Sequence, residues 1–200
     1  MRDRLRDAAA VTLRVSDSSP LSIETFLKDK NISSHLDFAS GTGRIAQFLE
    51  KNTNLYIKWP NDLLINKKKI AGILIDSISR GNKICELYVG IGINAKIAPS
   101  HLDYETTCLK NENIITVSRK KVLSKLIFYF NYWENVFKNN NFLYIANCWM
   151  KRSLPINSKI SFKDNKKIIN GIYKGISETG SIRILIDNKE CNFFNLETIA

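Results

Sequence analysis

The sequence predicts an α+β fold: a mixed, mainly antiparallel sheet with packed helices, followed by a small carboxy-terminal SH3-like β-barrel. Three observations support this class. Short apolar segments separated by turn residues between 55 and 94 predict a strand meander. A long segment with helical periodicity follows at 119–138, and period-two patterning begins after 157. A chain of 200 residues is long enough to bury a core of this kind.

The first part of the chain predicts one strand and one helix. A short strand is expected at 23–27, and Ser33 or Ser34 is suited to cap a helix that runs to about Lys51. Apolar and small residues recur along this segment at spacings of three and four. We expect this helix to precede the sheet.

The meander begins with a strand at 55–59, which Pro60 ends because proline has no N–H to donate to a ladder. Further strands are predicted at 63–65, 70–76 and 84–89. The segment 70–76 is almost continuously apolar, which favours burial on both faces.

The segment 119–138 is the clearest helix in the sequence. One apolar stripe follows it, and two further residues widen the stripe; the stripe is predicted to pack on the core. These residues are Val122, Leu126, Phe130, Trp133 and Phe137, widened by Leu123 and Ile127. A shorter helix is predicted at 142–150, and 96–117 is expected to be mostly loop.

From 157 onward, short strands alternate with turn signals such as Asp187-Asn188. This pattern predicts a separate small barrel with its own core. The core is expected to contain Ile160, Phe162, Ile172, Ile184 and Ile186. The chain would then divide into a catalytic domain, 1–152, and a carboxy-terminal domain, 153–200.

Composition narrows the class of protein. No apolar run approaches the roughly 20 residues that cross a bilayer, so no membrane partner is expected. The four cysteines have no metal-ligand spacing, which indicates free buried thiols in a cytoplasmic protein and no metal site of their own. The net charge of +11 favours acidic partners, but the lysines are spread along the chain. No nucleic-acid partner is therefore expected.

Polar residues gather where the first meander strand ends, in the segment Lys58-Trp59-Pro60-Asn61-Asp62. A lysine supplies a fixed positive charge, while an asparagine and an aspartate supply oxygen ligands. This set suits a nucleoside triphosphate with magnesium. The alternative is an ordinary turn with a solvated lysine, because Pro-Asn-Asp is common in turns.

Two further clusters follow. Lys69 enters an apolar strand in which Gly72 marks either a bulge or a ligand pressed against the backbone. Gly90-Ile91-Gly92-Ile93-Asn94 ends the next strand, and its glycines allow a ligand to approach the main chain. A lone Gly-x-Gly is weak evidence by itself, and no nucleophile constellation is visible. We expect Lys58 and Lys69 to lie on neighbouring strands and to face one cleft that also contains Asn94.

Together the three clusters resemble the biotin protein ligases. That family is marked by Lys-Trp-Pro-Asn-Asp, then Lys-(apolar)-Ala-Gly-Ile-Leu, then a strand that ends in Gly-x-Gly-Ile-Asn. Here these segments are 58–62, 69–74 and 90–94. The resemblance extends over roughly 19–200 and favours the biotin branch over the related lipoate ligases.

The resemblance implies a ligase that joins biotin to ATP as biotinyl-adenylate, with Mg²⁺, and then transfers biotin to a lysine of a biotin carrier domain of acetyl-CoA carboxylase. It also allows a homodimer. Carried over by position, the catalytic residues would be Lys69, Lys58 and Asp62, with Asp62 near the acceptor lysine. Biotin would contact Lys69, Gly72, Gly90 and Ile93, and ATP would contact Lys58, Asn61 and Asn94.

The chain departs from the family before the helix. The family carries a Gly-Arg-rich loop and then a tryptophan there, whereas the first glycine here is Gly41 and the first tryptophan is Trp59. A truncated or altered start would explain this, and weak biotin binding with slow or absent transfer is then expected. The alternative to a ligase is a carrier-binding module that has lost adenylation.

Overall fold

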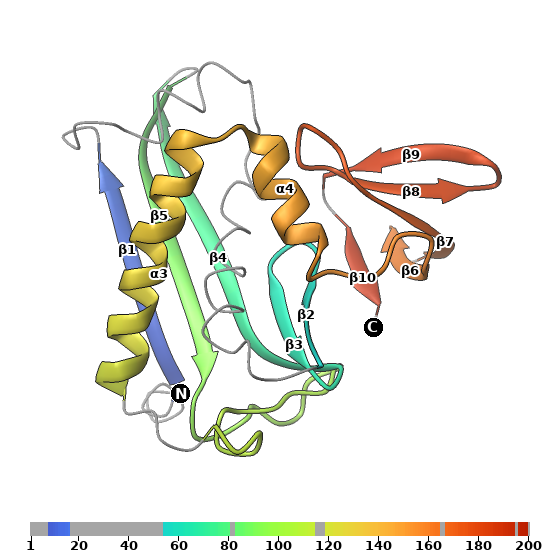
Figure 1. Cartoon of the computed structure of the whole chain (residues 1–200). Coiled ribbons are helices and arrows are strands. Elements are labelled where there is room, and N and C mark those ends of the chain that lie inside the picture. The colour runs from blue at the N-terminus through green and yellow to red at the C-terminus, as the bar shows by residue number, and fades with distance from the viewer. Residues whose placement is uncertain are drawn as a thin grey trace.

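This computed structural model describes residues 8–16, 54–80, 83–114, 119–164, 167–194 and 196–199. The strand predicted at 23–27 and the helix predicted up to Lys51 lie outside the described residues. Within the described part, two five-stranded sheets and two helices form the fold (Figure 1). In the same part of the chain, no helix is long and apolar enough to cross a membrane.

The first sheet has the strand order β1-β5-β4-β3-β2, and all of its strand pairs are antiparallel. The prediction of a sheet-rich, mainly antiparallel fold is confirmed. Its strands are β1 (Ala8–Ser16), β2 (Leu55–Lys58), β3 (Asp62–Ile65), β4 (Lys68–Arg80) and β5 (Lys83–Asn94). The strands β4 and β5 are longer than predicted, and β5 ends at Asn94 with Gly90 and Gly92 inside it.

The strand β1 was not predicted. It pairs with β5 along its whole length, from Ala8 opposite Asn94 to Ser16 opposite Glu86. Three consecutive alanines at 8–10 give little strand preference of their own. The strand therefore owes its conformation to tertiary pairing, which a single sequence does not display.

The hairpin between β3 and β4 turns on two residues. Asn66 and Lys67 have φ values of 51° and 65°. Two successive residues with positive φ are typical of a type I′ hairpin, whose twist matches that of the flanking strands. This turn fixes the start of β4 at Lys68 and places Lys69 at its second residue.

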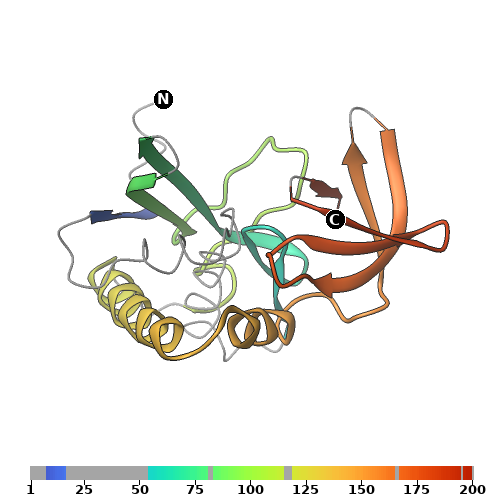
Figure 2. The same cartoon turned by 90° about the horizontal axis from the view of Figure 1, so that it is seen from above.

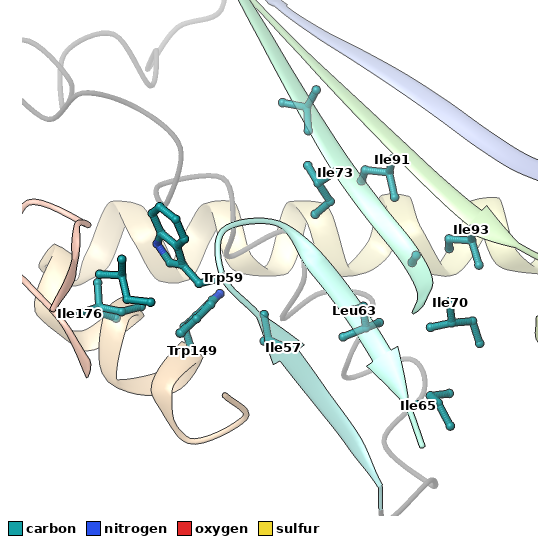
Figure 3. Packing of buried hydrophobic residues seen from close by; sticks show 14 of the residues in the cluster. Ile57, Trp59, Leu63, Ile65, Ile70, Ile73, Ile91, Ile93, Trp149 and Ile176 are labelled. Carbon is teal, nitrogen blue, oxygen red and sulfur yellow. The ribbon is translucent and has the colours of Figure 1, made fainter. Parts of the chain in front are cut away.

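The helices α3 (Arg119–Asn139) and α4 (Phe142–Met150) lie against one face of the first sheet, as Figures 1 and 2 show. On this face, cross-strand partners are buried together: Ile57, Leu63, Ala71 and Ile93 are each at most 2% exposed. Figure 3 shows the packing of several of these residues. The main core of the protein therefore lies between the sheet and the helices.

The apolar stripe of α3 is confirmed, because all five of its predicted residues are buried. The two residues expected to widen it are not: Leu123 and Ile127 are 40% and 42% exposed. Val122 and Leu126 join the main core, whereas Trp133 and Phe137 pack with Ile145 of α4. The apolar residues that flank this stripe face outward. The helix predicted at 142–150 is observed with those bounds.

The second sheet has the order β10-β6-β7-β8-β9 and is also antiparallel. Its strands are β6 (Lys159–Asp164), β7 (Lys167–Ile176), β8 (Ile182–Ile186), β9 (Lys189–Phe193) and β10 (Glu197–Ile199). Among the described residues no pairing of β9 with β10 closes a barrel.

Most of the expected core of this sheet is buried. Ile160, Phe162 and Ile184 are at most 6% exposed, and Ile186 packs at the edge of the cluster. Ile172 is 37% exposed, so its assignment to the core was wrong. The next residue along β7, Tyr173, takes the buried position instead, and a register shift follows it.

The two sheets meet through a shared set of buried residues. Ile57 of β2 and Trp59, which follows β2, belong to the same cluster as Trp149 of α4 and Tyr173 of the second sheet. The main-chain N–H of Ile57 donates to the carbonyl of Arg152 at 2.7 Å. The division at 152/153 stays a prediction, since the buried cluster is continuous across it.

A pair of phenylalanines tests this description of the second sheet. Phe162 is fully buried, whereas Phe194 is 47% exposed. We expect Phe162→Ala to lower the free energy of unfolding by about 3–5 kcal/mol, because it removes a buried ring and leaves a cavity. Phe194→Ala should cost less than about 1 kcal/mol. Urea unfolding measures both, and equal losses would contradict the assignment of the core.

Candidate functional site

A row of paired residues crosses the first sheet on the face opposite the helices. Lys58 pairs with Asp62, Asp62 with Gly72, and Gly72 with Gly92. Side chains of directly opposed residues in an antiparallel sheet lie on the same face. The neighbouring row, which contains Ile57, lies on the helix-covered face. The alternation of the strands therefore brings Lys58, Asp62 and two glycines to the uncovered face.

Lys69 extends over this row. Its Nζ lies 2.7 Å from Asp62 Oδ1 in an ion pair whose side chains are 28% and 22% exposed. A Cβ on Gly72 would lie 3.3 Å from Lys69 Cε and 3.2 Å from Asp62 Oδ1. The missing side chain of Gly72 thus makes room for the ion pair.

The structure corrects one expectation about the lysines. Lys58 is on β2 and Lys69 is on β4, with β3 between them, so they are not on neighbouring strands. The spacing in sequence suggested adjacency because β3 is only four residues long. Asp62 of β3 links the two positions, since it is the cross-strand partner of Lys58 and the ion-pair partner of Lys69.

Three glycines form what we call the glycine floor: Gly72, Gly90 and Gly92. A Cβ on Gly90 would come no closer than 3.6 Å to another atom, and one on Gly92 no closer than 3.9 Å. Leu74, opposite Gly90, is 67% exposed. A ligand on this face would therefore meet main chain directly. Gly92 was absent from the predicted site, although its spacing of two from Gly90 places it on the same face.

The loop after β5, residues 95–114, runs beside Lys69. The N–H of Lys69 donates to the carbonyl of Glu105, and the N–H of Thr107 donates to the carbonyl of Lys69, both at 2.9 Å. The ring centroid of Tyr104 lies 5.2 Å from Lys69 Nζ, within cation–π range. Sequence reasoning missed Tyr104, because the loop around it has no periodicity or motif.

Two asparagines from the predicted nucleotide site hold the main chain together. The side-chain amide of Asn61 donates to the carbonyl of Ile73 at 2.6 Å. That of Asn94 donates to the carbonyl of Thr107 at 3.0 Å and to that of Lys69 at 3.4 Å. Both amide nitrogens thus have structural partners, and the amide oxygens are the atoms that remain for a ligand.

Ile93 occupies a different face from the other predicted site residues. It is fully buried and lies in the row with Ala71 on the helix-covered face. Only the main chain of Ile93 is positioned for contact with a ligand on the glycine floor. Its predicted role in biotin binding stays a prediction in that restricted form.

The arrangement suits an anionic ligand. Lys69 is a fixed cation beside a bare stretch of main chain, and Lys58 adds positive charge to the same row. Asp62 neutralises part of this charge and determines where the Lys69 ammonium lies. Such a site would bind a carboxylate or phosphate at one end and let a flat body lie against the glycine floor.

The curated relatives of the chain are ligases by name. The chain is 31% identical over 133 residues to a biotin–[acetyl-CoA-carboxylase] ligase of Paracoccus denitrificans, a match that covers 64% of this chain and 55% of that protein. It is 26% identical over 129 residues to a bifunctional ligase/repressor of Escherichia coli K12, covering 63% and 40%. The matched segment thus spans about half the length of these relatives or less.

Solved structures share the fold. The biotin protein ligase from Aquifex aeolicus has a TM-score of 0.74 at 22% identity, covering 96% of this chain and 83% of that one. The same ligase in complex with biotin and ATP has a TM-score of 0.73.

The model of the biotin/lipoate A/B protein ligase family matches residues 35–94. Its described part, from Asn54 onward, contains the Lys58 row, the Lys69–Asp62 ion pair and the glycine floor. The segment 35–94 is therefore similar to the biotin/lipoate A/B protein ligase family, and it carries most of the candidate site.

Proposed function

We propose that this chain is a biotin–protein ligase, which forms biotinyl-adenylate from biotin and ATP and transfers biotin to a lysine of a biotin carrier domain of acetyl-CoA carboxylase. The observation that supports it most is the Lys69–Asp62 ion pair above the glycine floor. A cation held beside bare main chain supports the assignment of Lys69 to the biotin carboxylate.

In the first step, a carboxylate oxygen of biotin attacks the α-phosphorus of ATP, and pyrophosphate leaves. Two anions must approach each other, and Lys69 and Lys58 offset their repulsion as charge builds on the phosphate. Gly72 and Gly90 let the biotin ring lie against main chain. The side-chain amide oxygens of Asn61 and Asn94 are assigned to ATP binding.

In the second step, the amine of the acceptor lysine attacks the acyl carbon of the adenylate. An amide forms, AMP leaves, and the amine gives up a proton. Asp62, next to the reacting carboxylate through its contact with Lys69, is positioned to hold the incoming ammonium and to take up this proton.

Magnesium is expected with ATP. No three His, Cys, Asp or Glu side chains gather in the described part of the chain, so these residues form no cage for a metal. A single carboxylate such as Asp62, with amide oxygens nearby, fits Mg²⁺ that retains its waters and phosphate ligands. Magnesium would supply charge neutralisation at the phosphates.

The carboxy-terminal sheet and the cysteines each bear on a further part of the proposal. Its order β10-β6-β7-β8-β9 brings the last strand beside the first, as in a partly open SH3-like barrel. The free thiols of Cys108, Cys148 and Cys191 fit the cytoplasmic location expected from the sequence. A homodimer stays a prediction.

A carrier-binding module without adenylation is not favoured, since the relatives are ligases by name. The predicted effect of the missing Gly-Arg-rich loop concerns the segment before Asn54, of which the structure describes only β1. Slow transfer therefore stays a prediction of the sequence. A turnover of about 1 per second or faster would contradict it.

Lys69→Ala is the first test. We expect transfer of labelled biotin to a carrier domain, with Mg-ATP, to fall by about 100-fold or more, because a fixed cation at the reacting carboxylate is lost. Lys68→Ala is the matched control: Lys68 contacts the exposed Glu105 at 3.6 Å and should retain activity within about twofold. Equal activity of Lys69→Ala and the unmodified chain would show that the catalytic cation is elsewhere.

Asp62→Asn separates the two steps. The amide keeps the shape of the side chain but cannot take up the acceptor proton, so transfer to the carrier should fall by about 100-fold. Biotinyl-adenylate formation, followed by pyrophosphate release without carrier, should fall by less than about tenfold. If both steps fall equally, the role of Asp62 is limited to holding Lys69.

Gly92→Ala tests the glycine floor. A Cβ there meets only the carbonyl of Gly72 at 3.9 Å, so the chain should fold with unchanged stability or a gain of up to about 1 kcal/mol. The methyl group would stand on the floor, and biotin affinity should fall about tenfold or more. Calorimetric titration with biotin measures the affinity; unchanged affinity would place biotin elsewhere.

A further inference from the structure

A cavity of about 340 Å³ lies between the edge of the first sheet and the second sheet. Its walls come from β2, the end of α4, the segment that follows α4, and β6, β7 and β8. This volume is in the range of small-molecule sites. The cavity is separate from the glycine floor, which lies on β4 and β5 beyond β3.

The inner wall of the cavity is apolar and buried. Ile57, Ile160 and Ile182 are at most 6% exposed and line it together with the rings of Trp59 and Trp149. Figure 3 shows Trp149 beside Trp59 and Ile57. A ligand with a compact apolar body would bury its surface here.

The remaining lining is rich in hydrogen-bond donors and positive charge. Lys58, Lys67 and Lys159 line the cavity, and its described lining contains no aspartate or glutamate. Burial raises the pKa of Tyr173, which keeps its hydroxyl protonated beside Ser153 Oγ at 3.2 Å. This lining would therefore attract a negatively charged group.

The indole N–H of Trp149 adds a further hydrogen-bond donor to a residue that lines the cavity. The side chain is 3% exposed, and its Nε1 has no hydrogen-bond partner among the described residues. A buried donor without an acceptor costs about 1–3 kcal/mol. A ligand oxygen in the cavity would supply the acceptor.

We propose that this cavity is a binding site for a small amphipathic anion: an apolar or aromatic body that packs between Ile57, Ile160 and Trp149, and a carboxylate or phosphate that faces Lys67 and Lys159. The cavity shares Lys58 with the proposed ATP site but contains neither Lys69 nor the glycine floor, and the proposal does not depend on the ligase assignment. Because its walls come from both sheets, an occupant would hold them together.

Nuclear magnetic resonance tests the proposal on the full chain, labelled with ¹⁵N. Phenylacetate is the anionic probe and phenylacetamide its neutral counterpart, with Trp149→Phe to assign the indole signal. We expect the Trp149 Nε1–H signal to move and saturate with phenylacetate, because the N–H gains an acceptor. The signal of Trp133, which belongs to a different buried cluster, should stay in place. Phenylacetamide should bind at least about tenfold more weakly.

Two charge reversals test whether the lysines that line the cavity attract the anion. Lys67→Glu combined with Lys159→Glu should weaken phenylacetate binding by about tenfold or more. Lys163→Glu is the matched control, because Lys163 is exposed on the same strand as Lys159 but does not line the cavity. Its affinity should stay within about twofold. None of these lysines belongs to the proposed catalytic site.

The outcomes separate this site from the ligase site. Lys69→Ala should leave phenylacetate affinity unchanged, and saturating biotin should not displace the probe. An unmoved Trp149 signal at saturating phenylacetate would overturn the proposal. So would an equal loss of affinity in the Lys163→Glu control, since it would indicate attraction by net charge alone, and so would displacement by biotin.

Discussion

The register between β4 and β5 is the constraint on which the rest of the structure depends. In this ladder Ala71 lies opposite Ile93, and Gly72 lies opposite Gly92. A shift of one residue would reverse the faces of every side chain in β5. The same pairing therefore buries the isoleucines under the helices and presents the glycines on the other face. The hydrophobic core and the bare floor of the site are two results of one register.

The ion pair between Lys69 and Asp62 depends on this floor. Gly72 leaves the space that both side chains cross, and the main chain of Lys69 is fixed by the loop after β5. An anionic ligand would compete with Asp62 for the ammonium group. The Lys69 ammonium would then pair with the carboxylate of the ligand instead of that of Asp62, so it would keep a negatively charged partner. Asp62 would become available to the incoming amine. Because Asp62 lies close by, the Lys69 ammonium is paired either with Asp62 or with a bound anion. It is therefore not left unpaired in this half-buried site when one ligand replaces another.

The sequence predicted the elements with strong local signals. The helices α3 and α4 followed from periodicity, and β2 and β3 from short apolar segments between turns. The alanine-rich strand β1 was missed because its conformation depends on β5. Motifs identified Lys69, Asp62, Gly72 and Gly90, whereas Gly92 was left out and Tyr104 lies in a loop without pattern. Lys58 and Lys69 were wrongly expected on neighbouring strands, because sequence spacing does not reveal which strand lies between two others.

The segment from Lys58 to Asp62 connects the chemistry to the second sheet. Lys58 and Asp62 face the open side of the first sheet, while the intervening Trp59 is 4% exposed and joins the cluster that contains Trp149 and Tyr173. The edge of β2 is covered where Ile57 donates to the carbonyl of Arg152, which protects an otherwise open strand. The cavity lies at this junction, with Trp59 and Trp149 in its lining. A change in how the second sheet packs on β2 would therefore be transmitted through β2 to Lys58 and to the residues paired with it.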